Sequence, residues 1–493
     1  MDQLKQTSRS LLRRRNIQDM LAVAESPGRR NHLSRSMGAA SLTMLGVGNV
    51  IGTGIFFVFS ITVPKAGPAV VISFIFVAII AGLTALCYAE VASTVPVSGS
   101  AYSYALTTLG EFPAYLVGWC LMLEYGVGAA AVGVGWGDYL NALLEAVFGW
   151  RIPQWLSNGP MSDTVTGVIN LPAVVLVILC AVLLMRGVKE SARITVILVV
   201  VKISVLVMFS VIAFRSFSSD NLSPFAPNGF TGITAAFPAI FFTYTGLEIL
   251  ATASEEVKEP RKNIPRATGY AMLIVSSAYL IVVLAALGAQ KWTAFDGQEA
   301  GLSKILLDVS SSKLPAIILA AGAVISVFSV ALTSMYAQSR MMFAMARDGL
   351  LPRGLSKVNP RNLSPNRCVV TTAVLATVMA AILPMSKLWD MISIGMILAF
   401  IVVILTVFYL RRYMPDLERG FSVPLYPWLP LGAAAACVWA LTTIPEATWT
   451  WFGAWMIFAT IVYFGYSRRH STLSQHRAED LETLTDGELA AGG

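Results

Sequence analysis

The sequence predicts an all-α membrane protein with twelve transmembrane helices, and three observations lead to that fold class. Of its 493 residues, 56% are hydrophobic and only 13% are charged, too little charge to cover a soluble protein of this size. The apolar residues come in blocks of about 20, the helix length that crosses a bilayer. Because these blocks are continuous rather than alternating, they favour helices over the strands of a membrane barrel.

Twelve apolar blocks can be delimited in the chain. The first six cover residues 39–63, 69–91, 112–140, 167–185, 194–214 and 233–253. The second six cover residues 267–288, 314–338, 368–383, 388–410, 425–443 and 449–466. The expected organisation is therefore a polar, basic tail (1–38), a transmembrane domain (39–466) and a second polar tail (467–493).

The basic charge of the chain is a topology signal. Most of the 35 Lys and Arg residues fall in the two tails and in the loops on the same side of the membrane. That asymmetry is the positive-inside rule, so we expect both termini in the cytoplasm and an inner-membrane location. The net charge of +7 therefore indicates no nucleic-acid partner. The five cysteines are scattered without CxxC pairing and read as packing residues, and neither a metal site nor a cofactor is expected.

Two of the predicted spans are interrupted near their middle. The first carries Gly46, Gly48, Gly52 and Gly54, and the sixth carries the polar, glycine-containing stretch 242–248. Each is the first helix of a five-helix half. Paired interruptions at corresponding positions indicate a binding site at the membrane midplane. The alternative is that the glycines only allow close helix packing.

The exposed backbone at such breaks would suit a ligand that carries both a carboxylate and an ammonium group. The N–H groups at the start of the second half-helix, near Gly54, offer a positive dipole end to an anion. The carbonyls that end the first half-helix, and those of the sixth-span break, would accept from the ammonium. The candidate residues are Asn49, Val50, Ile51, Gly52, Thr53, Gly54, Phe242, Thr243, Tyr244, Thr245, Gly246 and Glu248.

At these positions the sequence resembles a known family. Residues 45–56, LGVGNVIGTGIF, resemble the GxGxxxGTGIF signature of amino acid permeases. Stretches 87–102, 123–128, 255–265 and 340–352 are similar to segments of the cationic amino acid transporter branch. The resemblance, which covers about 33–466, is to the amino acid–polyamine–organocation superfamily. It implies a LeuT-type fold of two inverted five-helix repeats plus two peripheral helices, with alternating access around the broken helices.

Ionisable groups inside spans are costly and usually mark function. In related proton-coupled permeases a helix 5 lysine occupies the position of a sodium site, and Lys202 matches it. The alternative is a static ion pair. Glu124 would balance Lys202, line the route to the site, or serve as a structural carboxylate. Glu248 would sense protons, favour a cationic substrate, or only stabilise a helix N-terminus. Glu90, near the cytoplasmic end of the second span, is expected to act at a gate or to anchor a loop.

Two further residues bear on the substrate. Phe242 lies where related permeases place an aromatic lid, although core packing is the plain alternative. Ser334 matches a position that is small in relatives that transport cations, so the resemblance leans toward Arg, Lys and ornithine. Pocket volume alone discriminates by only about 1–3 kcal/mol per methylene.

The function expected from the sequence is secondary active, proton-coupled transport of a free amino acid across the lipid bilayer. The alternatives are a broad or small-neutral amino acid permease or exchanger and, more distantly, a membrane sensor or partner subunit with the same fold. The sequence contains no nucleophile–base or metal spacing, so no enzyme is expected and no catalytic residue is assigned. It neither requires nor excludes a small membrane subunit.

Overall fold

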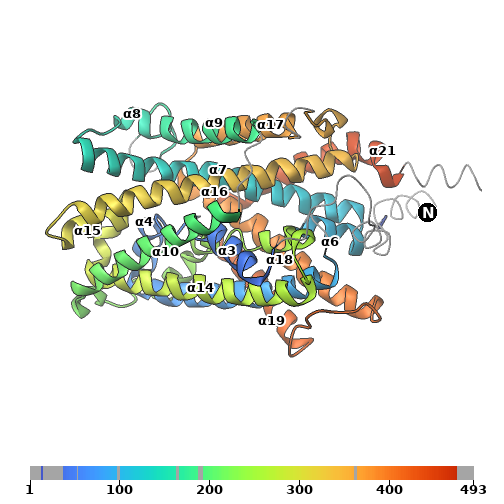
Figure 1. Cartoon of the computed structure of the whole chain (residues 1–493), viewed down its shortest axis with the longest axis horizontal. Helices are drawn as coiled ribbons and strands as arrows, with labels where there is room; N and C mark the ends of the chain where they lie inside the picture. The colour runs from blue at the N-terminus through green and yellow to red at the C-terminus, as the bar shows by residue number, and fades with distance from the viewer. Residues whose placement is uncertain are drawn as a thin grey trace, which may run out of the picture.

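The computed structural model describes residues 13–14, 37–52, 54–96, 100–162, 166–186, 192–359 and 364–474. Most of these residues lie in helices that run roughly along one axis (Figure 1). One end of the bundle carries α6 (Ser100–Thr108) and α21 (Arg468–His470), and we call it the tail end. The opposite, far end carries α8 (Gln154–Ser157) and α15 (Gly301–Val309).

Each predicted span coincides with a helix or with a broken set of helices. For the first six predicted spans these are α3 (Ala39–Val50) with α4 (Phe59–Ala66), α5 (Val70–Thr94), α7 (Glu111–Phe148), α9 (Leu171–Met185), α10 (Ala192–Arg215), and the set α11 (Gly229–Ala235), α12 (Phe237–Thr243) and α13 (Ile249–Thr252). The rest are α14 (Pro260–Ala289), α16 (Leu314–Arg347), α17 (Asn366–Ile382), α18 (Met385–Tyr413), α19 (Trp428–Thr442) and α20 (Glu446–Val462). Short 3₁₀ turns cover Gly67–Ala69, Ser219–Leu222, Ser254–Glu256, Trp292–Phe295 and Arg353–Ser356, and a π-helical turn covers Tyr463–Ser467.

Within the described residues, seven helical segments are long and apolar enough to cross a membrane, and five shorter apolar helices accompany them. Two of the five, Ala39–Val50 and Gly229–Thr243, are short because they end at the two breaks. The chain is therefore a multi-pass helical membrane protein.

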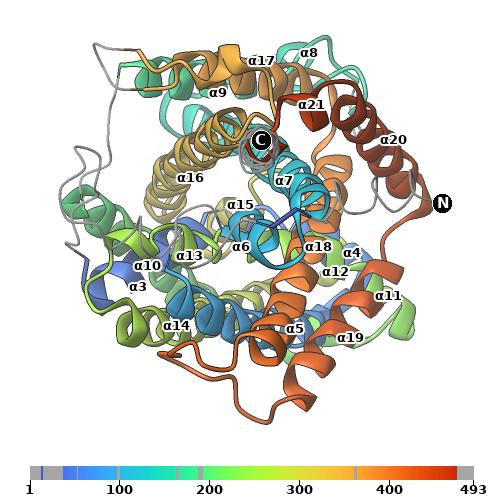
Figure 2. The same ribbon diagram turned by 90° about the vertical axis from the view of Figure 1, so that its right-hand side faces the viewer.

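The long helix α7 forms the centre of the bundle. Its most apolar window is 94% buried, whereas the corresponding window of α10 is 39% buried. α7 packs against α16 and α18, and α14 packs against α5, α3 and α10. Seen from the tail end, α9 and α17 lie along one edge and α5 and α14 along the opposite one (Figure 2). The broken helices are thereby enclosed between these two groups.

The described parts of the two tails meet at the same end of the bundle. The backbone N–H of Glu111, at the start of α7, donates to the carbonyl of Arg13 at 2.8 Å. The hydroxyl of Ser471 donates to the carboxylate of the same Glu111 at 2.7 Å. Segments from the two ends of the chain thus meet at one residue.

The first break separates α3 from α4. Ile51 turns to an extended conformation, with ψ of 108°, and Gly52 follows with φ of +123°. A Cβ at Gly52 would lie 3.2 Å from the carbonyl oxygen of Ser326 on α16. Only glycine adopts this conformation readily at so close an approach. The predicted interruption of the first span is therefore present.

The second break separates α12 from α13. The helix ends at Thr243, Gly246 has φ of +107°, and helical structure resumes at Ile249. A Cβ at Gly246 would lie 2.3 Å from the side-chain nitrogen of Asn49. The predicted interruption of the sixth span is also present, and its glycine faces the first break.

Candidate functional site

Direct hydrogen bonds hold the two breaks together. The side-chain amide of Asn49 donates to the carbonyl of Gly246 at 3.2 Å. The hydroxyl of Tyr279, on α14, lies 3.0 Å from the carbonyl oxygen of Val50 and 2.9 Å from that of Thr243. Tyr279 is fully buried and joins both breaks to a continuous helix. This role could not be predicted from the sequence, because one tyrosine in an apolar span looks like a packing residue.

Backbone donors gather at the first break. In the described part of the chain, the N–H groups of Gly52, Gly54 and Ile55 donate to no backbone carbonyl. All three residues are buried. Buried N–H groups are costly unless they find an acceptor, so this turn suits an anionic group. Thr53, the remaining candidate in this turn, lies outside the described residues.

The second break approaches this turn closely. A Cβ at Gly54 would lie 2.7 Å from the methyl carbon of Thr243 and 3.2 Å from the ring of Phe242. Tyr244 and Thr245 direct their side chains to other helices, where they hydrogen-bond Ser276 at 3.4 Å and the sulfur of Met396 at 3.5 Å. Their side chains support the break, and their backbone remains the part available to a ligand.

Three aromatic rings stack across the two breaks. The ring of Trp389, on α18, lies 5.4 Å from that of Phe242 and 5.7 Å from that of Phe57, with interplanar angles of 22° and 23°. Phe242 is 1% exposed and Trp389 is fully buried. Phe57 follows the first break and Phe242 precedes the second, so the stack covers both on one side. Sequence reasoning identified Phe242 but not the other two.

Truncation of Phe242 is expected to weaken substrate affinity more than it harms the protein. Phe242→Ala removes the ring at one end of this stack, and we expect KM to rise about tenfold, or about 1.4 kcal/mol. Initial rates of uptake in proteoliposomes measure this change. Phe241→Ala is the matched control, because Phe241 is equally buried but takes no part in the described stack. It should lower the melting temperature and leave KM within twofold. An unchanged KM in Phe242→Ala would make Phe242 a core residue only.

Lys202 sits where α10 crosses α3 and α16. Its Nζ donates to the carbonyl oxygen of Gly48 at 2.7 Å and to the hydroxyl of Ser329 at 2.9 Å. The side chain is 1% exposed, and it lines a small cavity with Gly48, Asn49 and Ser329. Gly48 lies in the last turn of α3, where carbonyls lack helical partners, so the ammonium occupies a position that the break creates. This hydrogen bond joins the fifth span to the first break.

Glu124 and Glu248 form a buried pair of carboxylates. They are 1% and 3% exposed, and they lie close enough for their charges to interact. One oxygen of Glu248 accepts the N–H of Gly246 at 3.0 Å, so this residue stabilises the second break locally. The other oxygen of Glu248, and Oε1 of Glu124, have no hydrogen-bond partner in the described part of the chain. Lys202 hydrogen-bonds Gly48 and Ser329, and the charge balance between Glu124 and Lys202 stays a prediction.

Ser334 stands apart from this arrangement. It is half-buried on α16, more than one turn beyond Ser329 toward the tail end. Two serines of α16 that do contact the site are Ser326, whose backbone approaches Gly52, and Ser329, which binds Lys202. Sequence reasoning missed these two, because small hydroxyl residues are common in membrane helices.

Comparison with known proteins places this arrangement in a family. The model of the amino acid permease family matches residues 37–475. A methylthioribose transporter of Bacillus subtilis is 38% identical over 94% of this chain and 100% of the relative. A branched-chain amino acid permease of the same organism is 36% identical over 94% and 99%. The vacuolar cationic amino acid transporter 4 of Arabidopsis thaliana is 33% identical over 83% and 68%.

The helical bundle with its two breaks is thus a membrane transporter and not an enzyme. The chain belongs to the amino acid permease family, within the amino acid–polyamine–organocation superfamily. The family resemblance read from the sequence motifs is confirmed. The names of the relatives span three kinds of substrate, so family membership does not fix the cargo.

Proposed function

We propose that this protein is a proton-coupled, secondary active transporter of a free amino acid, working by alternating access around the two breaks. The observation that carries the proposal is the contact of the buried Lys202 ammonium with the carbonyl of Gly48, at the end of a broken half-helix. A fixed cation in this position does what a bound sodium ion would do for the carbonyls at the break. The transporter then needs no sodium.

Recognition of the substrate would use the backbone of both breaks. The N–H groups of Gly52, Gly54 and Ile55 would bind the carboxylate. Carbonyl oxygens of the first and second breaks would accept hydrogen bonds from the ammonium. This mode reads the two ends common to all α-amino acids and leaves the side chain to the surrounding pocket.

Charge balance supports a cation at the site. Glu124 and Glu248 are two buried carboxylates whose charges interact. Like charges in a buried region do not readily ionise together, so a proton or a cationic side chain is needed there. A shared proton serves proton coupling, and a cationic side chain serves transport of Arg, Lys or ornithine.

The substrate proposal is a preference for cationic amino acids. The names of the two Bacillus relatives, a methylthioribose transporter and a branched-chain amino acid permease, favour an alternative without net side-chain charge. In that alternative the carboxylate pair keeps its proton for coupling only. The membrane is proposed to be the cell membrane, with both tails in the cytoplasm, because Lys and Arg concentrate on the side of the tails.

Uptake into proteoliposomes tests the proposed function. Arginine, leucine, alanine and methylthioribose are offered separately without sodium, with and without an inward proton gradient. We expect arginine to be accumulated several-fold above equilibrium only when the gradient is present. Accumulation of leucine or methylthioribose but not arginine would overturn the cationic preference. Strict dependence on sodium, or gradient-independent uptake of every substrate, would overturn proton coupling.

A further inference from the structure

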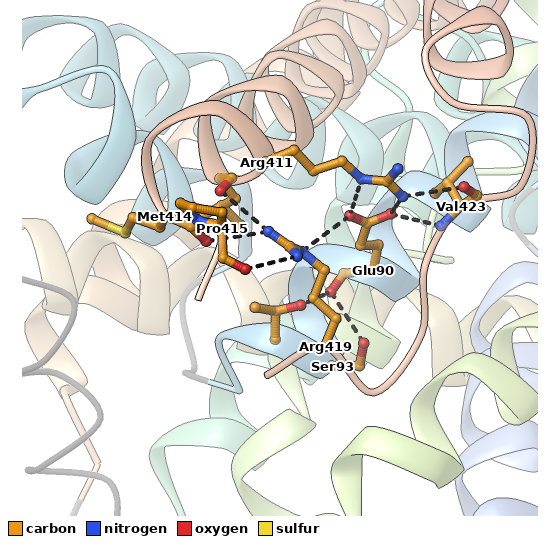
Figure 3. A network of polar contacts seen from close by, with 9 residues as sticks. Glu90, Ser93, Arg411, Met414, Pro415, Arg419 and Val423 are labelled. Atoms are coloured by element: carbon orange, nitrogen blue, oxygen red, sulfur yellow. Dashed lines mark hydrogen bonds and ion pairs between the residues drawn. The ribbon is translucent and has the colours of Figure 1, made fainter. Parts of the chain in front are cut away.

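The carboxylate of Glu90 is the centre of a second polar network, at the tail end of α5. It accepts from Nε and Nη2 of Arg411, on α18, at 2.8 and 2.6 Å (Figure 3). It also accepts the backbone N–H of Val423 at 2.7 Å and lies 3.9 Å from Arg419. Glu90 is 1% exposed, so one buried side chain fastens two helices and the chain that follows them.

The segment between α18 and α19, residues 414–427, forms a strap over this network. Arg411 donates to the carbonyl of Val423 at 3.1 Å, and its guanidinium lies over the ring of Tyr426 at 4.2 Å from the centroid. Nearer the start of the strap, Glu418 forms an ion pair with Arg261, which lies at the start of α14. The strap therefore touches both α5 and α14, but through contacts of different kinds.

The two ion pairs that hold the strap differ in burial. The side chains of Arg261 and Glu418 are 52% and 78% exposed, and an ion pair so open to water adds little and exchanges readily. The side chains of Arg411 and Glu90 are 17% and 1% exposed and form a bidentate pair. Separating them would remove the bidentate partner of a buried carboxylate, which is strongly unfavourable. This contact is suited to persist through a transport cycle.

α18 packs on α7 and α6 and also on α5 and α12. These contacts alone do not decide whether α18 moves with α7 and α6 or with α5 and α12. Its far half carries Trp389, which stacks on Phe242 and Phe57 at the two breaks. The position of α18 relative to α5 therefore sets how the aromatic stack meets the breaks.

We propose that Glu90 is a positioning residue for transport: through Arg411 it fastens the tail end of α18 to α5, so that the two helices move as one body during the cycle. The inference rests on the proposed alternating access. Glu90 touches neither the breaks nor the aromatic stack and acts on them only through α18. Without this contact α18 would follow α5 imperfectly, and the stack would open and close out of step with the breaks.

Neutralising Glu90 separates positioning from binding. Glu90→Gln keeps the size of the side chain but removes its charge, and we expect the maximal rate of substrate counterflow to fall at least tenfold. The substrate Kd, measured by isothermal titration in detergent with the substrate that wild type takes up, should stay within twofold. Glu418→Gln is the matched control, because it breaks the exposed pair of the same strap, and it should transport like wild type. A wild-type rate in Glu90→Gln, or an equal loss of rate in Glu418→Gln, would overturn the proposal.

A covalent bridge provides the second test, also for the case in which Glu90→Gln folds poorly. Glu90→Cys and Arg411→Cys are combined in a background whose five native cysteines are alanine, and a bifunctional thiol reagent of matching length joins them. If the helices move as one body, the bridged protein should regain at least half of the background rate, and the unbridged one should not. A bridge that blocks counterflow would show that the contact must open, which overturns the proposal.

Failure of the proposed function is distinguishable from failure of this inference. Counterflow needs no proton gradient and reports alternating access directly. Absence of counterflow in wild type would remove the proposed function itself. Normal counterflow in wild type together with normal counterflow in Glu90→Gln would remove only the positioning role.

Discussion

Lys202→Ala is expected to lose proton-driven accumulation of substrate while keeping substrate binding. The ammonium of Lys202 donates to the carbonyl of Gly48 and to the hydroxyl of Ser329. It thereby steadies the last turn of α3 beside the binding turn. In the proposed cycle, deprotonation loosens this bridge and favours release of the substrate. Alanine can neither carry the proton nor steady the carbonyl, whereas the N–H groups of Gly52 and Gly54 remain to bind the carboxylate.

Lys202→Ala is expected to lower the free energy of unfolding only moderately, whereas proton-driven accumulation is lost. Loss of hydrogen bonds from a buried charged group costs about 1.5–3 kcal/mol each, and the mutation removes the charge together with its contacts. We therefore expect folded protein, a substrate Kd within about fivefold of wild type, and no accumulation above equilibrium under an inward proton gradient. Exchange of internal for external substrate should persist, because it needs no net proton movement.

The matched control is Ser329→Ala, which removes the hydrogen bond from Lys202 to Ser329 but leaves the amine and its hydrogen bond to Gly48. Accumulation in this variant should be reduced and not abolished. Full accumulation by Lys202→Ala without sodium would end the coupling mechanism. Lys202 would then be a structural link between α10 and α3.

The positions of the helices were largely predictable because a membrane-spanning helix requires a continuous block of apolar residues. Blocks of about 20 apolar residues predicted every long helix to within a few residues at most ends. The larger deviations are helices that continue past the apolar block, as at Arg347, where α16 ends. Local hydropathy carries no signal for helix that projects into the polar phase. The short α6 and α15 escaped prediction for a related reason, because neither is long enough to span.

The breaks were predictable, and the groups that join them were not. Gly52 and Gly246 are recognisable in the sequence as glycines within apolar spans, and both have positive φ. Lys202 is recognisable as a charged residue within an apolar span, and it hydrogen-bonds the first broken helix. Its part in proton coupling stays a prediction. Tyr279 and Trp389 come from distant helices, and a single sequence does not say which face of a span meets a break.

Gly246→Val is expected to abolish both transport and substrate binding in a protein that still inserts. Gly246 has φ of +107°, a conformation that costs a residue with a Cβ about 1–3 kcal/mol. The added Cβ would also lie 2.3 Å from the amide nitrogen of Asn49, which real structures do not allow. Asn49 must therefore move, and its hydrogen bond to the carbonyl of Gly246 is lost.

The consequence reaches the binding turn because the two breaks are joined. Once Asn49 is displaced, Val50 and the donors that follow it shift relative to Thr243, and the carboxylate and ammonium sites no longer face one ligand. Gly432→Val is the matched control, since Gly432 is an exposed helical glycine on α19 with nothing within 4 Å of an added Cβ. Both variants should reach the membrane in similar amounts, and only Gly246→Val should lose the substrate-induced rise in melting temperature and all uptake. Near-normal uptake by Gly246→Val would mean that the substrate does not bind between the two breaks.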